Sequence, residues 1–373
     1  MARSALYQLS FAGFSVGRKT TRREFLQVPL AADAQISAQR EAATGRPGGG
    51  ISQPDDGALM MHVSRRAMAS QFEIRFPGVV PGMASGHEHD TQLALETLES
   101  LESLEEQMSF FRPTSEISRI NLLASEGPIE VEPELFQLLC LAKDIWRDTE
   151  GAFDITSTPL WQAWGFARRA GSAPTEEQIA DALSRVGFQF VELDDQCNTI
   201  RFSRPGIQLN LGGIGKGYAL DKCVLRLIQG GMDNFLLHAG QSSIFARDSW
   251  SIGIPHPLKA DRRIAEIRLR NRAIGTSSSR FQSFRHQGKL YGHIIDPRTG
   301  RPAEGVLSAT VLAVTSALAD ALSTAFYVLG PEKSLAYCQL HPEVGTVLLT
   351  PSSRGGNLEI HHSGLDDCDL VIK

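Results

Sequence analysis

The stretch from residue 288 to residue 324 holds the residues whose types and spacing could do the most chemistry. A short apolar strand is predicted to end at His293 and Asp296, just before a proline and a glycine break the chain. Asp320 and Thr324 stand four residues apart in a later segment of helix-forming composition, so they share one face of the predicted helix. That face therefore offers two hard oxygen donors on an otherwise apolar surface.

Asp320 lies between two alanines, and a carboxylate is costly to bury unless it is paired, hydrogen-bonded or bound to a cation. Metal binding is one interpretation. The other is structural, with Asp320 capping the helix and Thr324 returning its hydroxyl to the preceding turn. A further hypothesis groups Ser277, His293 and Asp296 as a hydrolase triad, although no Gly-x-Ser-x-Gly elbow supports it.

A second motif, between residues 208 and 221, combines four glycines with a lysine. We expect a strand at its start, a glycine-rich turn, and a helix that runs through Ile228. The glycines let the backbone approach a ligand closely, and Lys216 adds a cation at the start of the helix, which suits a diphosphate. A P-loop would need Ser or Thr where Gly217 stands and a glycine where Asn210 stands, and the Rossmann spacing also fails. The motif is therefore another phosphate-facing loop or only a tight turn.

A third segment, at residues 151–166, is rich in aromatic residues, and we call it the aromatic corner. It carries Phe153 beside one carboxylate, Asp154, and then two tryptophans and a phenylalanine. Taken alone, such a segment is typical of a hydrophobic core. Beside a flat heteroaromatic ligand it could form a stacking wall.

Composition indicates a globular protein. Of the 373 residues, 42% are hydrophobic and 21% are charged. The chain is long enough for one large domain or two. The formal net charge of −5 gives no general reason to expect nucleic acid as a partner. The five cysteines are odd in number and widely spaced, so neither a zinc site nor a disulfide framework is indicated.

Residues 1–57 are predicted to be a processed or disordered leader, because they are rich in Arg, Ala, Ser and Gly and end near a linker-like glycine run. The segment Thr21–Leu26 resembles the twin-arginine export signature, although the apolar run after it is short and is interrupted by Asp33. A functional leader would place a bacterial protein at the periplasmic face of the inner membrane, and a degenerate leader would leave it in the cytoplasm. No run approaches the roughly 18 apolar residues that span a bilayer, so no transmembrane helix is expected.

The rest of the chain, residues 59–373, is predicted to form one large α+β domain with mixed or antiparallel sheets and packed helices. The expected elements are a strand at Gln71–Phe76, an amphipathic helix with Leu98, Leu101, Leu104 and Met108 on its buried stripe, a helix at Pro133–Thr149, a helix at Ser316–Gly330 and a closing strand at Val344–Leu349. Single helices alternate with clustered strands, which is typical of this class.

Seven motifs occur in one order along the chain: Ala67–Ser70, Ser109–Asn121, Gly151–Asp154, Leu211–Asp221, Thr276–Ser277, His293–Gly300 and Ala319–Thr324. With them the chain resembles the FAD:protein FMN transferase (ApbE) family, formerly labelled as thiamine-biosynthesis lipoproteins, over roughly residues 61–350. One motif alone would be weak evidence, whereas the set in this order is highly specific.

The resemblance implies a Mg²⁺-dependent transferase with an ApbE-type fold. Such an enzyme splits the FAD diphosphate, releases AMP and leaves FMN esterified through phosphate to a Ser or Thr of an acceptor protein, for example a membrane redox subunit. It implies that Mg²⁺ is held by the Gly213 carbonyl, the Asp320 carboxylate and the Thr324 hydroxyl, which are hard oxygen ligands. His293 is implied as the group that takes up the acceptor's proton. The FAD contacts implied are Met68, Phe111, Ala152, Phe153, Asp154, Asn210, Lys216 and Ile295.

The chain departs from the family's common pattern at four places. Members commonly have glycine where this chain has Ala69, Gln241 and Ser278, and aspartate where it has Asn210. The amide of Asn210 still forms hydrogen bonds but carries no charge, and a side chain at 278 restricts a backbone that glycine leaves free. Two alternatives therefore stay open: a Mg²⁺-dependent FAD pyrophosphatase, in which water replaces the acceptor hydroxyl, and an FAD-binding protein without turnover.

Overall fold

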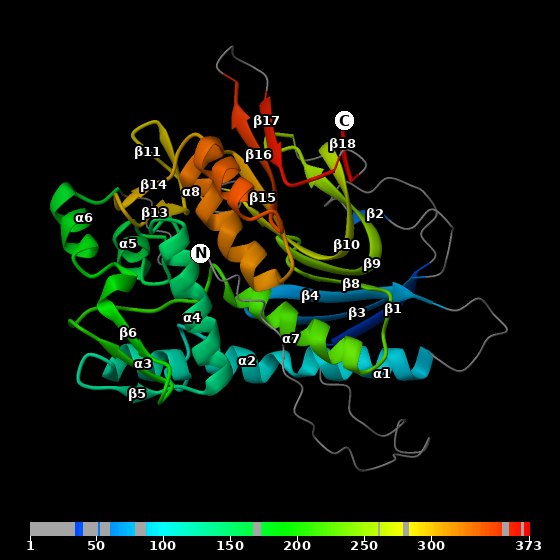
Figure 1. Ribbon diagram of the computed structural model, residues 1–373, viewed down its shortest axis with the longest axis horizontal. Helices are drawn as coiled ribbons and strands as arrows, with labels where there is room; N and C mark the ends of the chain where they lie inside the picture. Colours follow the sequence, from blue (N-terminus) through cyan, green and yellow to red (C-terminus); the bar gives the residue numbers. More distant parts are fainter. Residues whose placement is uncertain are drawn as a thin grey trace.

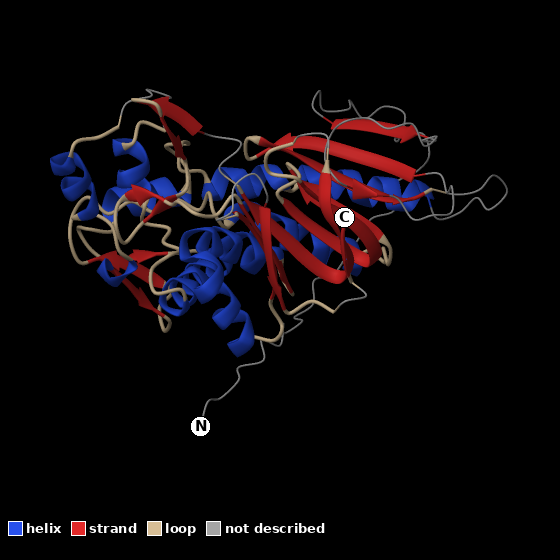
Figure 2. Ribbon diagram, turned by 90° about the horizontal axis from the view of Figure 1, so that it is seen from above, coloured by secondary structure: helices blue, strands red, loops and turns tan. Residues whose placement is uncertain are grey.

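The computed structural model describes residues 34–39, 51–52, 60–78, 87–166, 173–259, 262–278, 283–352, 358–366 and 369–373. These residues form a large antiparallel sheet at one end of the molecule and a lobe of helices and short strands at the other (Figures 1 and 2). The predicted α+β class is confirmed.

The main sheet has eleven strands in the order β1-β3-β4-β8-β9-β10-β15-β16-β17, with β18 beside β10 and β2 beside β9. Its strands are β1 (Ala34–Gln39), β2 (Ile51–Ser52), β3 (Met60–Ala67), β4 (Ser70–Pro77), β8 (Phe235–Ala239), β9 (Ser243–Pro255), β10 (Arg263–Ser277), β15 (Ser308–Ala313), β16 (Gly345–Pro351), β17 (Leu358–Ser363) and β18 (Leu370–Ile372). Three smaller sheets are built from β5 (Ile129–Glu130), β6 (Val191–Asp194) and β7 (Thr199–Phe202), from β11 (Ser283–His286) and β12 (Lys289–Gly292), and from β13 (Ile295–Asp296) and β14 (Arg301–Pro302).

The helices are α1 (His87–Glu99), α2 (Leu101–Met108), α3 (Glu116–Leu123), α4 (Pro133–Asp148), α5 (Thr158–Ala163), α6 (Glu176–Leu183), α7 (Gly215–Gln229) and α8 (Ser316–Leu340), with a short 3-10 turn at Phe188–Phe190. Helices α1 and α7 run along one face of the main sheet, and α8 lies between that sheet and the lobe that contains α3 to α6 (Figure 1). Among the described residues, no helix has the length and apolar character needed to cross a bilayer.

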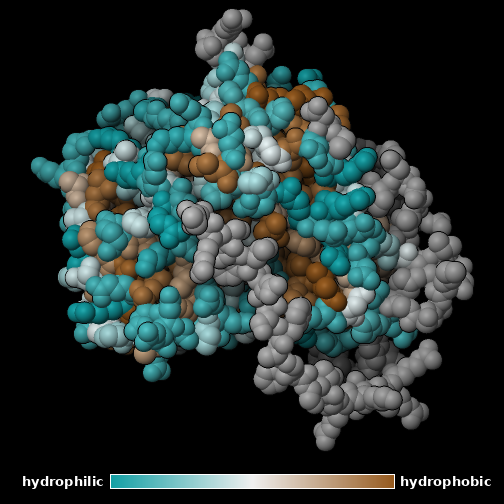
Figure 3. Space-filling model, viewed as in Figure 1, coloured by the Kyte–Doolittle hydropathy of each residue, from teal (hydrophilic) through white to brown (hydrophobic). Residues whose placement is uncertain are grey.

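Two apolar cores hold α7 and α8 in place. One lies between α1, α7 and the sheet and includes Phe72, Leu98, Leu220 and Phe235. The other joins α8 to α4 and the lobe and includes Phe326. Burial of these side chains on both sides fixes the two helices that carry the motifs of greatest interest. The surface seen in Figure 3 is largely hydrophilic, with apolar residues in separate patches, as expected of a globular protein.

Several predicted elements differ in detail from the structure. The predicted amphipathic helix is divided at Ser100 into α1 and α2, although its stripe residues Leu98, Leu101 and Met108 are buried as expected. The glycine stop predicted at the end of the Ser316 helix is confirmed, because Gly330 has φ 77° and ψ 177°, but a second helical segment follows directly to Leu340.

The segment predicted as a leader contributes two short strands. β1 pairs with β3, and β2 pairs with β9. Residues 1–33, 40–50 and 53–59 lie outside the described residues, and with them the twin-arginine signature. The leader and the boundary of the folded domain therefore stay predictions.

Candidate active site

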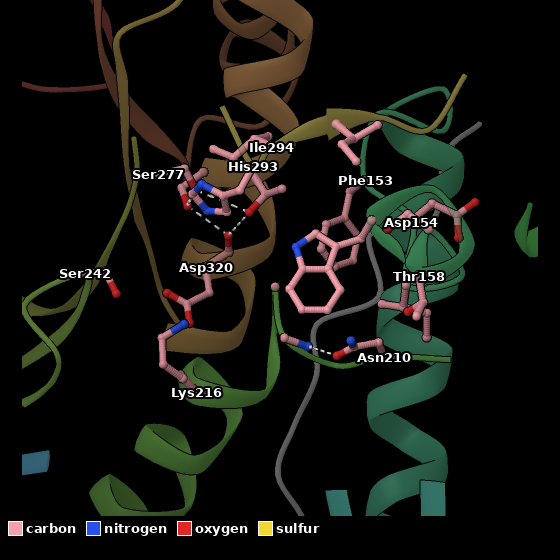
Figure 4. Close-up of a pocket in the computed structure, with 18 of the residues that line it drawn as sticks. Phe153, Asp154, Thr158, Asn210, Lys216, Ser242, Ser277, His293, Ile294 and Asp320 are labelled. Carbon is pink, nitrogen blue, oxygen red and sulfur yellow. Dashed lines mark hydrogen bonds between the residues drawn. The ribbon is translucent and has the colours of Figure 1, made fainter. Parts of the chain in front are cut away.

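One cavity of about 680 Å³ lies between the main sheet and the helical lobe. The site residues expected from the sequence all line it: Met68, Phe111, Ala152, Phe153, Asp154, Asn210, Gly213, Lys216, His293, Ile295, Asp320 and Thr324. Figure 4 shows His293, Lys216 and Asp320 on one side of the cavity and Phe153, Asp154 and Asn210 on the other. We call these the α7–α8 side and the ring side.

Two glycines position Asp320 by allowing backbone to pack against backbone. A side chain at Gly217, on α7, would overlap the Ser316 carbonyl of α8, and one at Gly275, on β10, would overlap the Ala319 carbonyl. α8 therefore approaches α7 and β10 at a distance that only glycine permits. At this contact the Gly217 N–H donates a hydrogen bond of 2.8 Å to Asp320 Oδ2.

Asp320 is a buried acid, with 6% of the residue exposed. Burial raises the pKa of its carboxyl, while Lys216 and hydrogen bonds from Ser243 and the Gly217 N–H act in the opposite direction. The side chain of Thr315 accepts a first-turn N–H and so caps α8. The interpretation of Asp320 as the helix cap is therefore wrong, and the residue instead lines the cavity.

Hydroxyl groups gather beside Asp320. Ser277 Oγ lies 2.9 Å from Ser323 Oγ and 3.2 Å from Thr324 Oγ1. Thr324 also donates to the main-chain oxygen of Asp320 at 3.4 Å, as the structural interpretation of this threonine predicts. A Cβ built on Gly213 would lie 3.8 Å from Thr324 Oγ1, so the glycine turn is adjacent to this group.

The three ligands implied for Mg²⁺ are thus neighbours, and their chemistry fits a hard cation. They offer one carboxylate, one hydroxyl and one carbonyl oxygen, which are the donor types that Mg²⁺ prefers. The described part of the chain contains no group of three or more His, Cys, Asp or Glu side chains that could hold a metal. A Mg²⁺ site here would therefore depend on a single carboxylate and leave positions for water and for oxygens of a bound ligand.

The segment before the glycine turn does not form the predicted strand and is held by a side chain. The segment from Gln208 belongs to none of the described sheets. The side-chain amide of Asn121, in α3, accepts from the Leu209 N–H at 2.7 Å and donates to the Leu209 carbonyl at 2.9 Å, as a neighbouring strand would. Asn210 Oδ1 then accepts the Gly212 N–H at 3.0 Å and tightens the turn. The strand prediction is wrong because Asn121, distant in sequence, supplies these bonds.

The carboxylate on the ring side faces the protein. Asp154 Oδ1 accepts from the N–H and the hydroxyl of Thr156 at 2.8 and 2.7 Å, and Oδ2 accepts from the Phe188 N–H at 3.1 Å. Burial raises the pKa of Asp154 to about 6. The side chain of Asp154 therefore stabilises the corner that carries Phe153, and the other atoms of the residue line the cavity.

Phe111 lies at the mouth of the cavity and is 73% exposed. Its N–H donates to Ser109 Oγ at 3.2 Å. The Ser109 carbonyl accepts the hydroxyl of Ser115 at 2.5 Å, and Ser115 is the N-cap of α3. An exposed ring held in this way is available to stack on a flat ligand.

Two turns at the cavity place residues with side chains in a left-handed backbone conformation, the second of them next to Gly240, which has φ of 59°. Met68 and Ala69 join β3 to β4 with φ of 50° and 57°, and Gln241 between β8 and β9 has φ of 66°. Residues with side chains adopt this conformation at a cost. Ala69 and Gln241 occupy positions where the family pattern commonly has glycine, so the chain keeps a backbone that glycine would favour.

The hydrolase triad does not form. Asp296 is paired with Arg298, whose Nε and Nη2 lie 2.8 and 2.9 Å from its two carboxylate oxygens. Ser277 is hydrogen-bonded to Ser323 and Thr324, as described above. Ser277 and Asp296 are therefore both engaged with other residues, while His293 lines the cavity.

Several polar residues of the cavity had no role assigned from the sequence: Ser70, Ser157, Thr158, Ser242 and Thr276. Hydroxyl residues are common on loops, so their types gave no signal. Asp221 also had no role assigned from the sequence, although it ends the glycine motif and stands four residues after Gly217 on the same helix face.

Comparison with known proteins gives a consistent result. The Vibrio cholerae protein described as "Flavin Transferase ApbE" has a solved structure that matches with a TM-score of 0.72 at 29% identity, covering 82% of this chain and 97% of that chain. The ApbE protein of Thermotoga maritima matches with a TM-score of 0.70 at 28% identity, covering 80% and 96%. These matches define the fold as that of the solved ApbE proteins.

The sequence comparisons agree. The sequence profile of the ApbE family matches residues 68–348. A Haemophilus influenzae protein named "FAD:protein FMN transferase" is 31% identical over 290 residues, which are 74% of this chain and 82% of that protein. A Vibrio cholerae protein of the same name is 31% identical over 291 residues, covering 76% and 85%. The chain belongs to the ApbE family, and the resemblance inferred from its motifs is confirmed.

Proposed function

We propose that this protein is an FAD:protein FMN transferase. The observation that carries the proposal is the two-sided cavity, which has Phe153 on one side and, on the other, Lys216 and an oxygen-rich group around Asp320 (Figure 4), with the exposed ring of Phe111 also in its lining. A flat ring joined to a diphosphate matches this division of apolar and polar groups. Relatives that carry the transferase name supply the reaction.

In this reaction the acceptor hydroxyl oxygen attacks the phosphorus on the FMN side of the diphosphate. The bond to the bridging oxygen breaks, AMP leaves, and the phosphate of FMN is left esterified to the acceptor. His293 takes up the proton of the attacking hydroxyl, since histidine is the side chain suited to proton transfer near neutral pH. Lys216, in the first turn of α7, offers a cation to the diphosphate.

Asp320, Thr324 and the Gly213 carbonyl would hold Mg²⁺ on the α7–α8 side. When bound, the cation neutralises negative charge on the diphosphate and on the leaving phosphate. The protein's own contribution is to hold the three oxygen donors together beside Lys216, on backbone that is fixed by the glycine contacts of α8. Positions fixed in advance are what electrostatic stabilisation of a transition state requires.

The test is to incubate the purified protein with FAD and Mg²⁺, with and without the soluble domain of a membrane redox subunit as acceptor. AMP is measured by chromatography and the acceptor by mass spectrometry. We expect AMP release that depends on the acceptor, together with an acceptor mass increased by FMN less one water. Release of AMP and free FMN without acceptor would identify an FAD pyrophosphatase, and bound FAD without AMP would identify a flavin-binding protein.

The proposed location is the periplasmic face of the bacterial inner membrane. It is supported by the twin-arginine signature at Thr21–Leu26. A fusion of residues 1–57 to a reporter that is active only after export should be active, and replacement of Arg22 and Arg23 by lysine should abolish its export. Equal export of both fusions, or none of the first, would contradict a twin-arginine route.

A further inference from the structure

Asp221 is a residue of α7 with no role in the reaction described so far. Its carboxylate bonds to the next helix, because Oδ1 accepts the Ser316 N–H at 2.6 Å and Oδ2 accepts the Ala317 N–H at 2.9 Å. These are the first N–H groups of α8, which have no partner within their own helix. A carboxylate at a helix N-terminus also interacts favourably with the helix dipole.

A third hydrogen bond between the same helices runs in the opposite direction. The Gly217 N–H of α7 donates to Asp320 Oδ2 of α8 at 2.8 Å. On α7, Asp221 stands four residues after Gly217, and on α8, Asp320 stands four residues after Ser316. The Gly217 bond and the pair of bonds at Asp221 are therefore one helical turn apart on each helix, between antiparallel segments.

Hydrogen bonds at two places one turn apart fix both the rotation and the axial position of α8 against α7. A single bond would leave α8 free to pivot about it. Since α7 begins at Gly215, two residues after Gly213, and contains Lys216, this register also sets where Asp320 stands relative to the glycine turn. The close contact at Gly217 leaves no side chain between the helices to absorb a shift.

We propose that Asp221 is a positioning residue that sets the register of α8 against α7 and so places Asp320 and Thr324 opposite Gly213 for metal binding. The inference rests on the proposed function for its kinetic part, but metal binding can be measured without turnover. It deepens the assignment of the α7–α8 side by naming the residue that holds the donor set together.

Three variants separate positioning from simple support of a helix end. Asp221→Asn places an amide N–H₂ opposite one of the two N–H donors, so one bond and the charge are lost. Asp221→Glu keeps the charge and both oxygens but adds one methylene, which displaces α8 without removing its anionic partner. Thr315→Ala is the matched control, because it removes the side chain that accepts the Leu318 N–H at the start of α8 and leaves the Asp221 carboxylate in place.

The measurements are Mn²⁺ binding to FAD-free protein by electron paramagnetic resonance, thermal unfolding, and kcat for AMP release. We expect both Asp221 variants to raise the Mn²⁺ dissociation constant at least about tenfold and to lower kcat. Thr315→Ala should lose a comparable amount of thermal stability but change the dissociation constant less than about threefold. Normal Mn²⁺ affinity in Asp221→Glu, or equal weakening in Thr315→Ala, would overturn the proposal.

Two further outcomes are distinct. Absence of Mn²⁺ binding in the unmodified protein would overturn the proposal together with the metal assignment. If Mn²⁺ binds and the Asp221 variants weaken it, but no AMP is released with any acceptor, the positioning role stands and the proposed transferase activity fails. Should Asp221→Asn not fold, Asp221→Glu and the control decide the question alone.

Discussion

The two sides of the cavity are built by different means. On the α7–α8 side, Asp320 is 6% exposed, and its place is set by backbone contacts at Gly217 and Gly275. On the ring side, Phe111 is 73% exposed and stands on a loop held by serine hydroxyls. The α7–α8 side fixes the position of its polar atoms through main-chain packing, whereas the ring side offers the exposed surface of an aromatic ring.

This difference matches the demands of the proposed chemistry. Charge stabilisation and in-line attack require reacting atoms within about 3 to 3.5 Å of each other, so small displacements reduce the rate strongly. Stacking of a flat ring tolerates lateral movement because it depends on area. We therefore expect substitutions on the α7–α8 side to act on kcat and those on the ring side to act on FAD affinity.

Asp320→Ala should have the largest effect. Removal of the only carboxylate in the donor set should lower AMP release by more than about 1,000-fold, because the diphosphate's charge is then left unneutralised. AMP release at saturating FAD and Mg²⁺ measures this. A variant that keeps near-normal turnover and loses only about 1 kcal/mol of stability would show that Asp320 supports the helix and no metal.

His293→Asn should slow the reaction by roughly 100-fold, as expected when a general base is lost. FAD affinity, measured by flavin fluorescence titration, should be nearly unchanged, because asparagine keeps a polar group of similar size at the cavity wall. Collapse of affinity with an unchanged rate at saturating FAD would place His293 among the binding residues.

Gly217→Ala tests whether the backbone contact is needed. The added methyl overlaps the Ser316 carbonyl, so α8 must shift, at a cost of about 1 to 3 kcal/mol in unfolding free energy and a fall in kcat. Gly127→Ala is the control, since a Cβ there meets no atom within 4 Å, and it should change stability by less than about 0.5 kcal/mol. Equal behaviour of the two variants would contradict the contact's importance.

Phe111→Ala should have the smallest effect, and it should change FAD affinity instead of kcat. Loss of one stacking face should raise the FAD dissociation constant about tenfold, or ~1.4 kcal/mol, with kcat at saturating FAD within about twofold. Isothermal titration with FAD and steady-state kinetics give the two numbers. A large fall in kcat with unchanged affinity would remove the proposed division of labour between the two sides.

Much of the α7–α8 side could be predicted from the sequence. Asp320 and Thr324 share a helix face by spacing alone, and the glycine motif indicated close backbone approach; the structure agrees with both. These features depend on residues near one another in the chain. The close packing of Gly217 on Ser316 could not be predicted, because it joins elements that are distant in sequence.

The ring side was less predictable for a related reason. The sequence located Asp154 on this side, and Asp296 next to the cavity residue Ile295, but it did not show the direction of their carboxylates. Asp154 faces the Phe188 N–H, and Asp296 faces Arg298. Side-chain direction is decided by the donors available after folding, and a sequence pattern specifies the residue type without its partner.

The helix α3 restricts how the cavity can open. Its N-cap Ser115 holds the loop of Phe111, and its Asn121 holds Leu209 beside Asn210. Phe111 and Asn210, which both belong to the ring side, thus share one support. A rotation of α3 would carry both residues together, so the cavity would widen or narrow against α8 while the spacing between Phe111 and Asn210 stayed constant.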